Sequence, residues 1–218
     1  MMVAALFVHA GGAYYGLDDV DPWDSARDAT IYAGPHSVVA HPPCSRWCRL
    51  AGLVEARWGH KRGEDGGLFA SALASVRRWG GVLEHPAWSA AWPAFGLPVP
   101  SRGGGWQRGI CGGWTCHVEQ GRYGHPAKKA TWLYAFVEDP RLLPALRWGS
   151  SLDTDSDALV SWCGNKVPLP RARIGDFPSN GNTRWRERRR LYPREASATP
   201  TEFRDALLSI ARSARAVM

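Results

Sequence analysis

The sequence predicts an α/β fold with a mostly parallel sheet. Three short apolar runs, at residues 3–8, 37–43 and 82–86, are each followed closely by glycine or proline, as buried strands often are. A helical pattern at 64–81 connects the second and third runs through short links. Strand, helix and strand in this order form a βαβ unit, whose two strands pair in parallel.

The helical pattern is specific. Its apolar residues recur at the i, i+3, i+4, i+7 spacing of one helix face: Phe69, Ala72, Leu73 and Val76. The pair Gly80-Gly81 then ends the helix. The third apolar run, "VLEHP", follows directly, so we expect the helix to pack back onto the sheet.

The remaining segments are assigned in chain order. Residues 13–30 are acidic and rich in turn formers, and residues 96–113 form a glycine-rich excursion. Two further strands are expected within 114–137, joined around "GHPAKK". We expect one domain over 1–218, with an irregular basic region at about 138–198.

A closing helix is expected at about 199–216. Thr199 would be its N-cap, Pro200 would lie in its first turn, and Glu202 at the third position would complete a capping box. The helix would then begin at the end of the basic region.

The net charge of +7 favours a polyanionic partner, with nucleic acid first, although a basic protein of no such function has the same balance. The run "RWRERRR" at 184–190 suits contact with the DNA backbone. We expect its contacts from Arg184, Arg186 and Arg188, and stacking of a base on Trp185.

Five cysteines make an odd count, and the apolar start "MMVAALFV" is too short for a signal peptide. No apolar run has the length of a membrane span. We therefore expect reduced thiols and a cytoplasmic protein with no membrane partner.

Cys44 and Glu84 each lie at the carboxyl end of a predicted parallel strand. Because the carboxyl ends of parallel strands meet at one edge of a sheet, a thiol and a carboxylate are expected at one site. The alternatives for Cys44 are a buried structural cysteine or a zinc ligand with Cys48, Cys111 and Cys116. Their C-x3-C and C-x4-C spacings differ from the common C-x2-C, so we expect no metal.

Three motifs in fixed order carry a resemblance: "HPPC" at 41–44, "GGVLEHP" at 80–86 and "RYGHPAKKATWLY" at 122–134. Together they resemble the cytosine-C5 DNA methyltransferases, which have Pro-Cys after one strand, Glu-Asn-Val at the end of the next and a later "YG-x-P" segment. The start, "LFVHAGGAYYGL", resembles the cofactor loop of that family.

The resemblance implies a Rossmann-like, class I methyltransferase domain that acts on a base flipped out of duplex DNA. Cys44 would add to C6 of the pyrimidine, and Glu84 would hydrogen-bond N3. Pro43 would stiffen the nucleophile's loop, Lys129 would lie near the base or a phosphate, and Lys128 would contact phosphate.

The same resemblance implies S-adenosylmethionine as the donor of a one-carbon group to C5. The residues that would bind it are Phe7, Gly11, Gly12, Asp21 and Trp23. The cofactor half is shorter than in the family, as expected of a reduced relative on a phage genome. Two alternatives therefore stay open: modification or removal of a C5 substituent without S-adenosylmethionine, and a non-catalytic DNA-binding or decoy protein.

Overall fold

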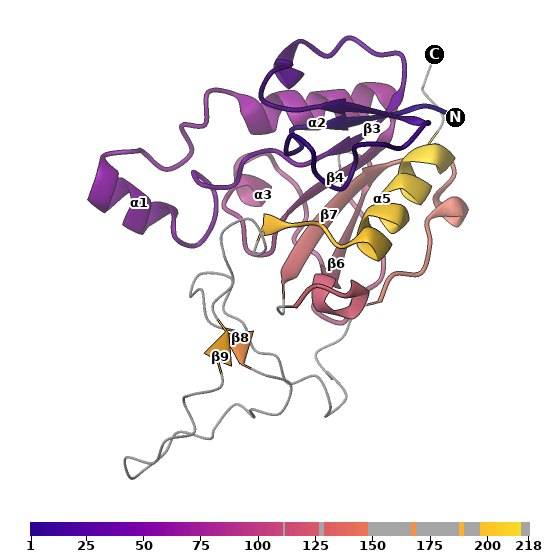
Figure 1. The fold of residues 1–218 in the computed structure, drawn as a ribbon. Helices are drawn as coiled ribbons and strands as arrows, with labels where there is room; N and C mark the ends of the chain where they lie inside the picture. Colours follow the sequence, from indigo (N-terminus) through magenta and orange to yellow (C-terminus); the bar gives the residue numbers. More distant parts are fainter. Residues whose placement is uncertain (111, 127–128, 148–166, 169–187, 190–196, 215–218) are drawn as a thin grey trace.

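The computed structural model describes residues 1–110, 112–126, 129–147, 167–168, 188–189 and 197–214 (Figure 1). Its centre is a seven-stranded mixed sheet in the order β2-β1-β3-β4-β7-β6-β5. The strands are β1 (Val3–Leu6), β2 (Val20–Trp23), β3 (Ser37–Ala40), β4 (Gly81–Pro86), β5 (Gln107–Arg108), β6 (Trp114–Glu119) and β7 (Ala130–Phe136). A separate two-stranded pair joins β8 (Val167–Pro168) to β9 (Arg188–Arg189).

The sheet has a parallel half and an antiparallel half. Strands β2, β1, β3 and β4 pair in parallel, and this part of the prediction is confirmed. Strands β4, β7, β6 and β5 pair antiparallel. The link from β6 to β7, residues 120–129, is shorter than the crossover that a parallel pair needs, so these two strands meet as a hairpin.

Helices cover both faces of the sheet. The α-helices are α1 (Ala51–Trp58), α2 (Leu68–Trp79), α3 (Ala91–Ala94) and α5 (Thr201–Ser213), and the 3-10 turns are η1 (Ala29–Ile31), η2 (Gln120–Tyr123) and η3 (Pro140–Leu142). In Figure 1, α5 lies on the near face of the sheet and α2 on the opposite face, whereas α1 projects sideways from the body.

Each face has its own apolar core. On the α5 face, Val82 and Leu133 pack with Phe203 and Leu207. On the α2 face, Leu83 packs with Phe69 and other apolar side chains of α2. The alternation of Val82 and Leu83 along β4 follows from the two-residue period of a strand, which therefore also fixes the face of Glu84.

The predicted βαβ unit is confirmed: β3, α2 and β4 occur at the expected residues, and α2 ends at Gly80. Gly81 has φ of 121°, and a Cβ there would lie 1.9 Å from the Val38 carbonyl oxygen. Only glycine fits where β4 approaches β3 this closely. This contact aligns β3, which precedes Cys44, with β4, which carries Glu84.

Two local predictions are wrong. Residues 13–30 contain β2, an edge strand; Pro22 is accommodated there because β2 pairs with β1 alone. The capping box is absent because Pro200, not Thr199, is the N-cap of α5. The Pro200 carbonyl accepts the Arg204 N–H at 2.8 Å, so the helix begins at Thr201, and Glu202 pairs with Arg147 instead.

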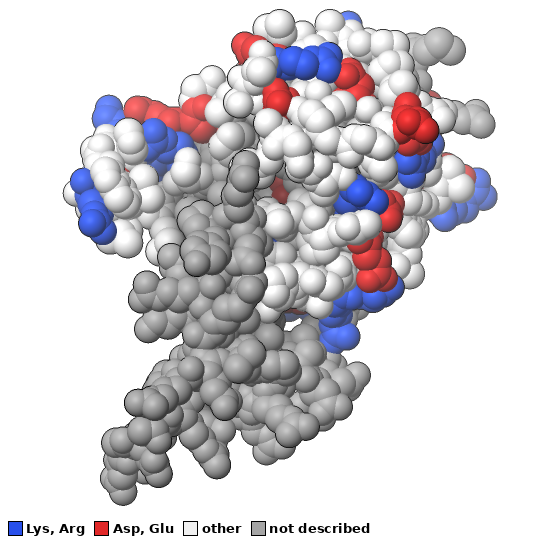
Figure 2. Space-filling model, in the orientation of Figure 1, with Lys and Arg blue, Asp and Glu red and all other residues white. Residues whose placement is uncertain are grey.

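Most of the predicted basic region at 138–198 lies outside the described residues. Within the described part, no helix is long and apolar enough to cross a membrane. On the face shown in Figure 2, basic and acidic side chains alternate rather than gathering by sign. Several of them are paired, as Arg212 is with Asp19.

Candidate active site

A pocket of about 410 Å³ opens at the carboxyl edge of the parallel strands. It is lined by the loop after β1, the loop after β3, the end of β4, the start of β7 and the segment before α5. The lining residues include Phe7, Gly11, Gly12, Tyr14, His41, Pro43, Cys44, Glu84, Lys129 and Ser197. The predicted nucleophile, the predicted acid and the predicted cofactor loop thus share one cavity.

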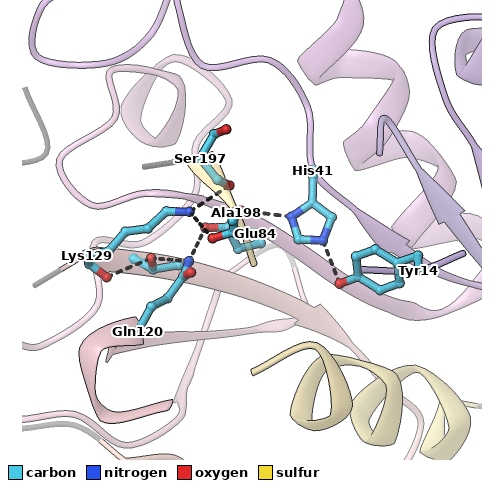
Figure 3. Close-up of polar contacts among 8 residues, drawn as sticks. Tyr14, His41, Glu84, Gln120, Lys129, Ser197 and Ala198 are labelled. Atoms are coloured by element: carbon cyan, nitrogen blue, oxygen red, sulfur yellow. Dashed lines mark hydrogen bonds and ion pairs between the residues drawn. The ribbon is translucent and has the colours of Figure 1, made fainter. Parts of the chain in front are cut away.

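Glu84 is at the centre of the pocket's polar network (Figure 3). His41 Nδ1 lies 2.9 Å from Glu84 Oε2, and Gln120 Nε2 donates to Glu84 Oε1 at 3.0 Å. Burial by itself would raise the pKa of Glu84, but His41 and Lys129 outweigh it and lower the pKa to about 2. Glu84 is therefore a carboxylate with a protein partner on each oxygen.

The protonation of His41 follows from its neighbours. A carboxylate only accepts hydrogen bonds. His41 Nδ1 therefore carries a hydrogen and donates a hydrogen bond to Glu84. The other ring nitrogen, Nε2, lies 2.8 Å from the Tyr14 hydroxyl. Burial raises the pKa of Tyr14 well above its usual value, so this group remains a phenol. Tyr14, His41 and Glu84 form a continuous hydrogen-bonded chain along the pocket wall (Figure 3).

Gln120 supports Glu84 from the antiparallel half of the sheet. Its Nε2 also donates to Thr131 Oγ1 at 2.9 Å, and the Thr131 hydroxyl donates to the Lys129 carbonyl. Gln120 is fully buried. A buried amide whose nitrogen donates two hydrogen bonds has a fixed orientation. Gln120 therefore also holds the carboxylate of Glu84 in place.

Lys129 reaches the pocket because β7 runs antiparallel to β4. The amino end of β7 therefore lies at the same edge as the carboxyl ends of β3 and β4. The side chain is 7% exposed, and burial lowers its pKa. Its ammonium donates to the carbonyls of Ser197 at 3.1 Å and Ala198 at 3.3 Å, so it holds the segment before α5 against the pocket.

Cys44 faces the same cavity and is only partly exposed. Burial raises the pKa of its thiol to about 12, with Cys48 and Glu84 adding to the effect. At pH 7 the side chain is therefore a thiol in this conformation. Cys48 is buried one turn further on, and its N–H donates to the Cys44 carbonyl at 2.8 Å. Pro43 is exposed at the pocket mouth.

The loop after β1 forms the pocket's second wall. Phe7 adopts φ of 59°, a left-handed conformation that a non-glycine residue rarely takes and that recurs at functional sites. The Gly12 N–H donates to the His9 carbonyl at 2.9 Å, and a Cβ on Gly12 would lie 2.9 Å from that oxygen. The turn therefore needs a glycine here, and it keeps the backbone of Gly11 and Gly12 open to the cavity.

Asp21 and Trp23 lie at the end of β2 and do not line the pocket. The Asp21 carboxylate binds the Arg27 guanidinium and accepts the Trp23 indole N–H. The Arg27 guanidinium also lies 4.0 Å from the centre of the Trp23 ring. Two of the residues expected to bind S-adenosylmethionine are thus engaged by Arg27 outside the pocket, and they do not fit that cofactor as they stand.

No protein-family model, no curated protein and no solved structure matches this chain.

The predicted DNA contacts Lys128, Arg184, Trp185 and Arg186 lie outside the described residues. For Arg188, only the backbone is described, as part of β9. Of the four cysteines considered as zinc ligands, Cys111 is also outside. Among described side chains, no three of His, Cys, Asp and Glu gather as metal ligands.

Sequence reasoning missed His41, Tyr14 and Gln120. The signal for His41 was available, because it directly precedes "PPC" at the end of β3. Tyr14 lies in the glycine-rich loop that we assigned to cofactor binding. Gln120 had no signal, because its role depends on the antiparallel pairing that places it behind Glu84.

Proposed function

We propose that this protein modifies a pyrimidine base in DNA, with Cys44 as the nucleophile that adds to C6. The observation that carries the proposal is the shared pocket: Cys44, Glu84 and Lys129 line one cavity of about 410 Å³. These residues belong to three sequence motifs in the order of the cytosine-C5 DNA methyltransferases. A cavity of this size holds one base, which would have to leave the duplex.

The proposed chemistry uses the charge states of the site. As the bond from Cys44 Sγ to C6 forms, the C5–C6 π electrons move towards C5 and the ring gains charge at N3. The resting side chain is a thiol, so its proton must leave in the same step. Glu84, the carboxylate of the pocket, accepts that proton and passes it to N3, so that no external acid is consumed.

His41 and Gln120 have supporting roles in this proposal. Both donate to Glu84, which holds the carboxylate in the orientation that reaches the base. Tyr14, hydrogen-bonded to the other ring nitrogen of His41, holds the imidazole with Nδ1 towards Glu84. The activated C5 then attacks a one-carbon donor, whose leaving group departs. Loss of the C5 proton and breakage of the Cys44–C6 bond then restore the aromatic ring and the free cysteine.

We propose further that the fold is Rossmann-like and that the protein works in a cytoplasm, where Cys44 remains reduced, as a phage-encoded relative of the methyltransferases would. The parallel order β2-β1-β3-β4, with the pocket at its carboxyl edge, supports the fold assignment. The reduced compartment is supported by three described free cysteines: Cys44, Cys48 and Cys116.

Two candidate functions differ in whether S-adenosylmethionine is the donor. The loop of Phe7, Gly11 and Gly12 supports S-adenosylmethionine, because it opens into the pocket. The engagement of Asp21 and Trp23 by Arg27 favours the second candidate, in which Cys44 activates the base for a different donor or for removal of a C5 substituent.

Covalent trapping tests the proposal. The protein is mixed with duplex DNA of mixed sequence containing 5-fluorocytosine, or 5-fluorouracil, with and without S-adenosylmethionine. An SDS-stable adduct is expected that Cys44→Ala abolishes and Cys48→Ala retains. In unsubstituted DNA, exchange of the C5 hydrogen with solvent reports addition to C6 without any donor.

The outcomes separate the candidates. An adduct that needs S-adenosylmethionine identifies a methyltransferase. Cys44-dependent exchange that S-adenosylmethionine does not alter identifies base activation for another donor. If neither adduct nor exchange occurs, the proposal is wrong, and binding without catalysis is the function that is left.

A further inference from the structure

A second feature is an exposed tryptophan near Pro86, which lines the pocket, with two arginines close to its ring. Trp88 follows the end of β4 by two residues and is 40% exposed. The Arg49 guanidinium lies 5.9 Å from the centre of its ring, and that of Arg102 lies 5.5 Å away. Both arginines are exposed. None of these three residues takes part in the network around Glu84.

The backbone of Trp88 is strained. Its φ of 62° is left-handed, and among described non-glycine residues only Phe7 shares this feature. Such a conformation is unfavourable for a residue with a side chain, and it recurs at functional sites. The strain at Trp88 therefore points to a use for this loop.

The ring packs against two buried aromatic side chains. His117 lies with its ring centre 6.0 Å from that of Trp88, and Trp132 does so at 6.3 Å. Both of these residues are buried. A large flat ring that is packed against the body of the protein and remains 40% exposed can stack on a base.

The two arginines come from separate loops. Arg49 follows Cys44 by five residues, and Arg102 belongs to the excursion between α3 and β5. The loop of Arg49 is tied to that of Trp88 by the Ala90 N–H, which donates to the Trp47 carbonyl at 2.8 Å. Within the described residues, neither Arg49 nor Arg102 forms an ion pair. Their charges are thus available to an anionic partner.

We infer that Trp88, Arg49 and Arg102 form a nucleotide-binding surface on which a base of the DNA strand stacks while the two arginines contact its phosphates. The inference rests on the proposed function in taking DNA as the partner. An aromatic face beside unpaired guanidinium groups is the combination that binds an unstacked nucleotide. Because the loops of Cys44 and Glu84 carry two of these residues, the surface would hold a nucleotide near the flipped base.

The test is the affinity of the full chain for a fluorescein-labelled mixed-sequence duplex, measured by fluorescence anisotropy at several salt concentrations. Trp88→Ala is expected to weaken binding about tenfold, whereas Trp88→Phe, which keeps a ring, stays within about threefold. Arg49→Ala and Arg102→Ala should each reduce the salt slope by about one. Arg78→Ala is the matched control, because Arg78 is exposed beside Trp79 at the opposite edge of the sheet.

The inference is overturned if Trp88→Ala and Arg102→Ala bind DNA as Arg78→Ala does, or if the unaltered protein does not bind the duplex. Circular dichroism identifies a variant that fails to fold, and Arg49→Ala and Arg102→Ala then decide the result. The outcome of the trapping experiment does not depend on the outcome of this binding test. Loss of affinity in Trp88→Ala without any Cys44 adduct would support this surface and reject the catalytic proposal, and the reverse pattern would do the opposite.

Discussion

The imidazole of His41 connects the carboxylate of Glu84 to the phenol of Tyr14. Its Nδ1 lies 2.9 Å from Glu84 Oε2 and its Nε2 lies 2.8 Å from the Tyr14 oxygen. Three residues from three segments are therefore joined in one line of hydrogen bonds at the pocket (Figure 3). His41 also lies three residues before Cys44, so the loop that would carry the nucleophile also carries the partner of the acid.

Loss of His41 should impair the site without unfolding it. His41→Leu removes the donor to Glu84 Oε2, and a hydrogen bond to a charged group contributes about 1.5–3 kcal/mol. We expect adduct formation to slow by roughly 10- to 100-fold. His41→Gln, whose amide can still donate, should recover part of the rate. Equal rates in both variants and the unaltered protein would show that His41 does not position Glu84.

The pH dependence of trapping should show how the Cys44 proton leaves. The pKa of the thiol is raised to about 12 and that of Glu84 is lowered to about 2, so between pH 7 and 9 Glu84 stays ionised while the free thiolate fraction grows about tenfold for each pH unit. Because Glu84 takes the proton in the addition step, the initial rate of adduct formation, measured with excess 5-fluorocytosine duplex, should change little over this range. Cys48→Ala provides the control and should show the same profile. A rise of about tenfold for each pH unit would mean that the free thiolate attacks and that Glu84 does not take the proton.

Acid should destabilise the protein in two stages. Burial lowers the pKa of His85 to about 4, so the unfolded state takes up a proton first, and stability falls as the pH drops from about 6.5 to 4. The pKa of Glu84 is lowered to about 2, so its contribution is complete above about 4.5 and is lost between there and about 2. Each shift corresponds to about 3 kcal/mol.

Urea unfolding at a series of pH values checks this dependence. His85→Gln should remove the loss between pH 6.5 and 4 while keeping the loss at lower pH. If the variant and the unaltered protein lose stability in parallel over the upper range, His85 is not the group responsible.

Lys129 should matter for stability as well as for the site. Lys129→Met leaves the carbonyls of Ser197 and Ala198 without their donor and removes a positive charge near Glu84. We expect Tm to fall by about 4–8 °C, from a loss of about 2 kcal/mol. Lys61→Met, at an exposed position paired with Glu64, is the matched control and should change Tm little. A drop of equal size in both variants would reject the anchoring role.

Local patterns in the sequence determined the strand before Cys44, the strand that carries Glu84 and the helix between them. The spacing of apolar residues, the glycines at 80 and 81 and the prolines after each strand act within a few residues, so they can be read without the fold. Two parallel strands then bring their carboxyl ends to one edge. For this reason, the thiol and the carboxylate were placed at one site, and the structure puts both in one pocket.

Only the tertiary structure decided the chemistry around them. The antiparallel pairing of β7 with β4 brings Lys129 to the same edge, and that of β6 with β7 places Gln120 behind Glu84. The single pairing of β2 allows Pro22 in a strand that looked like a turn. The states of Cys44 and Glu84 arise from burial and from charges distant in sequence, which no local pattern records. Residue types and strand ends come from the sequence, whereas partners and protonation come from packing.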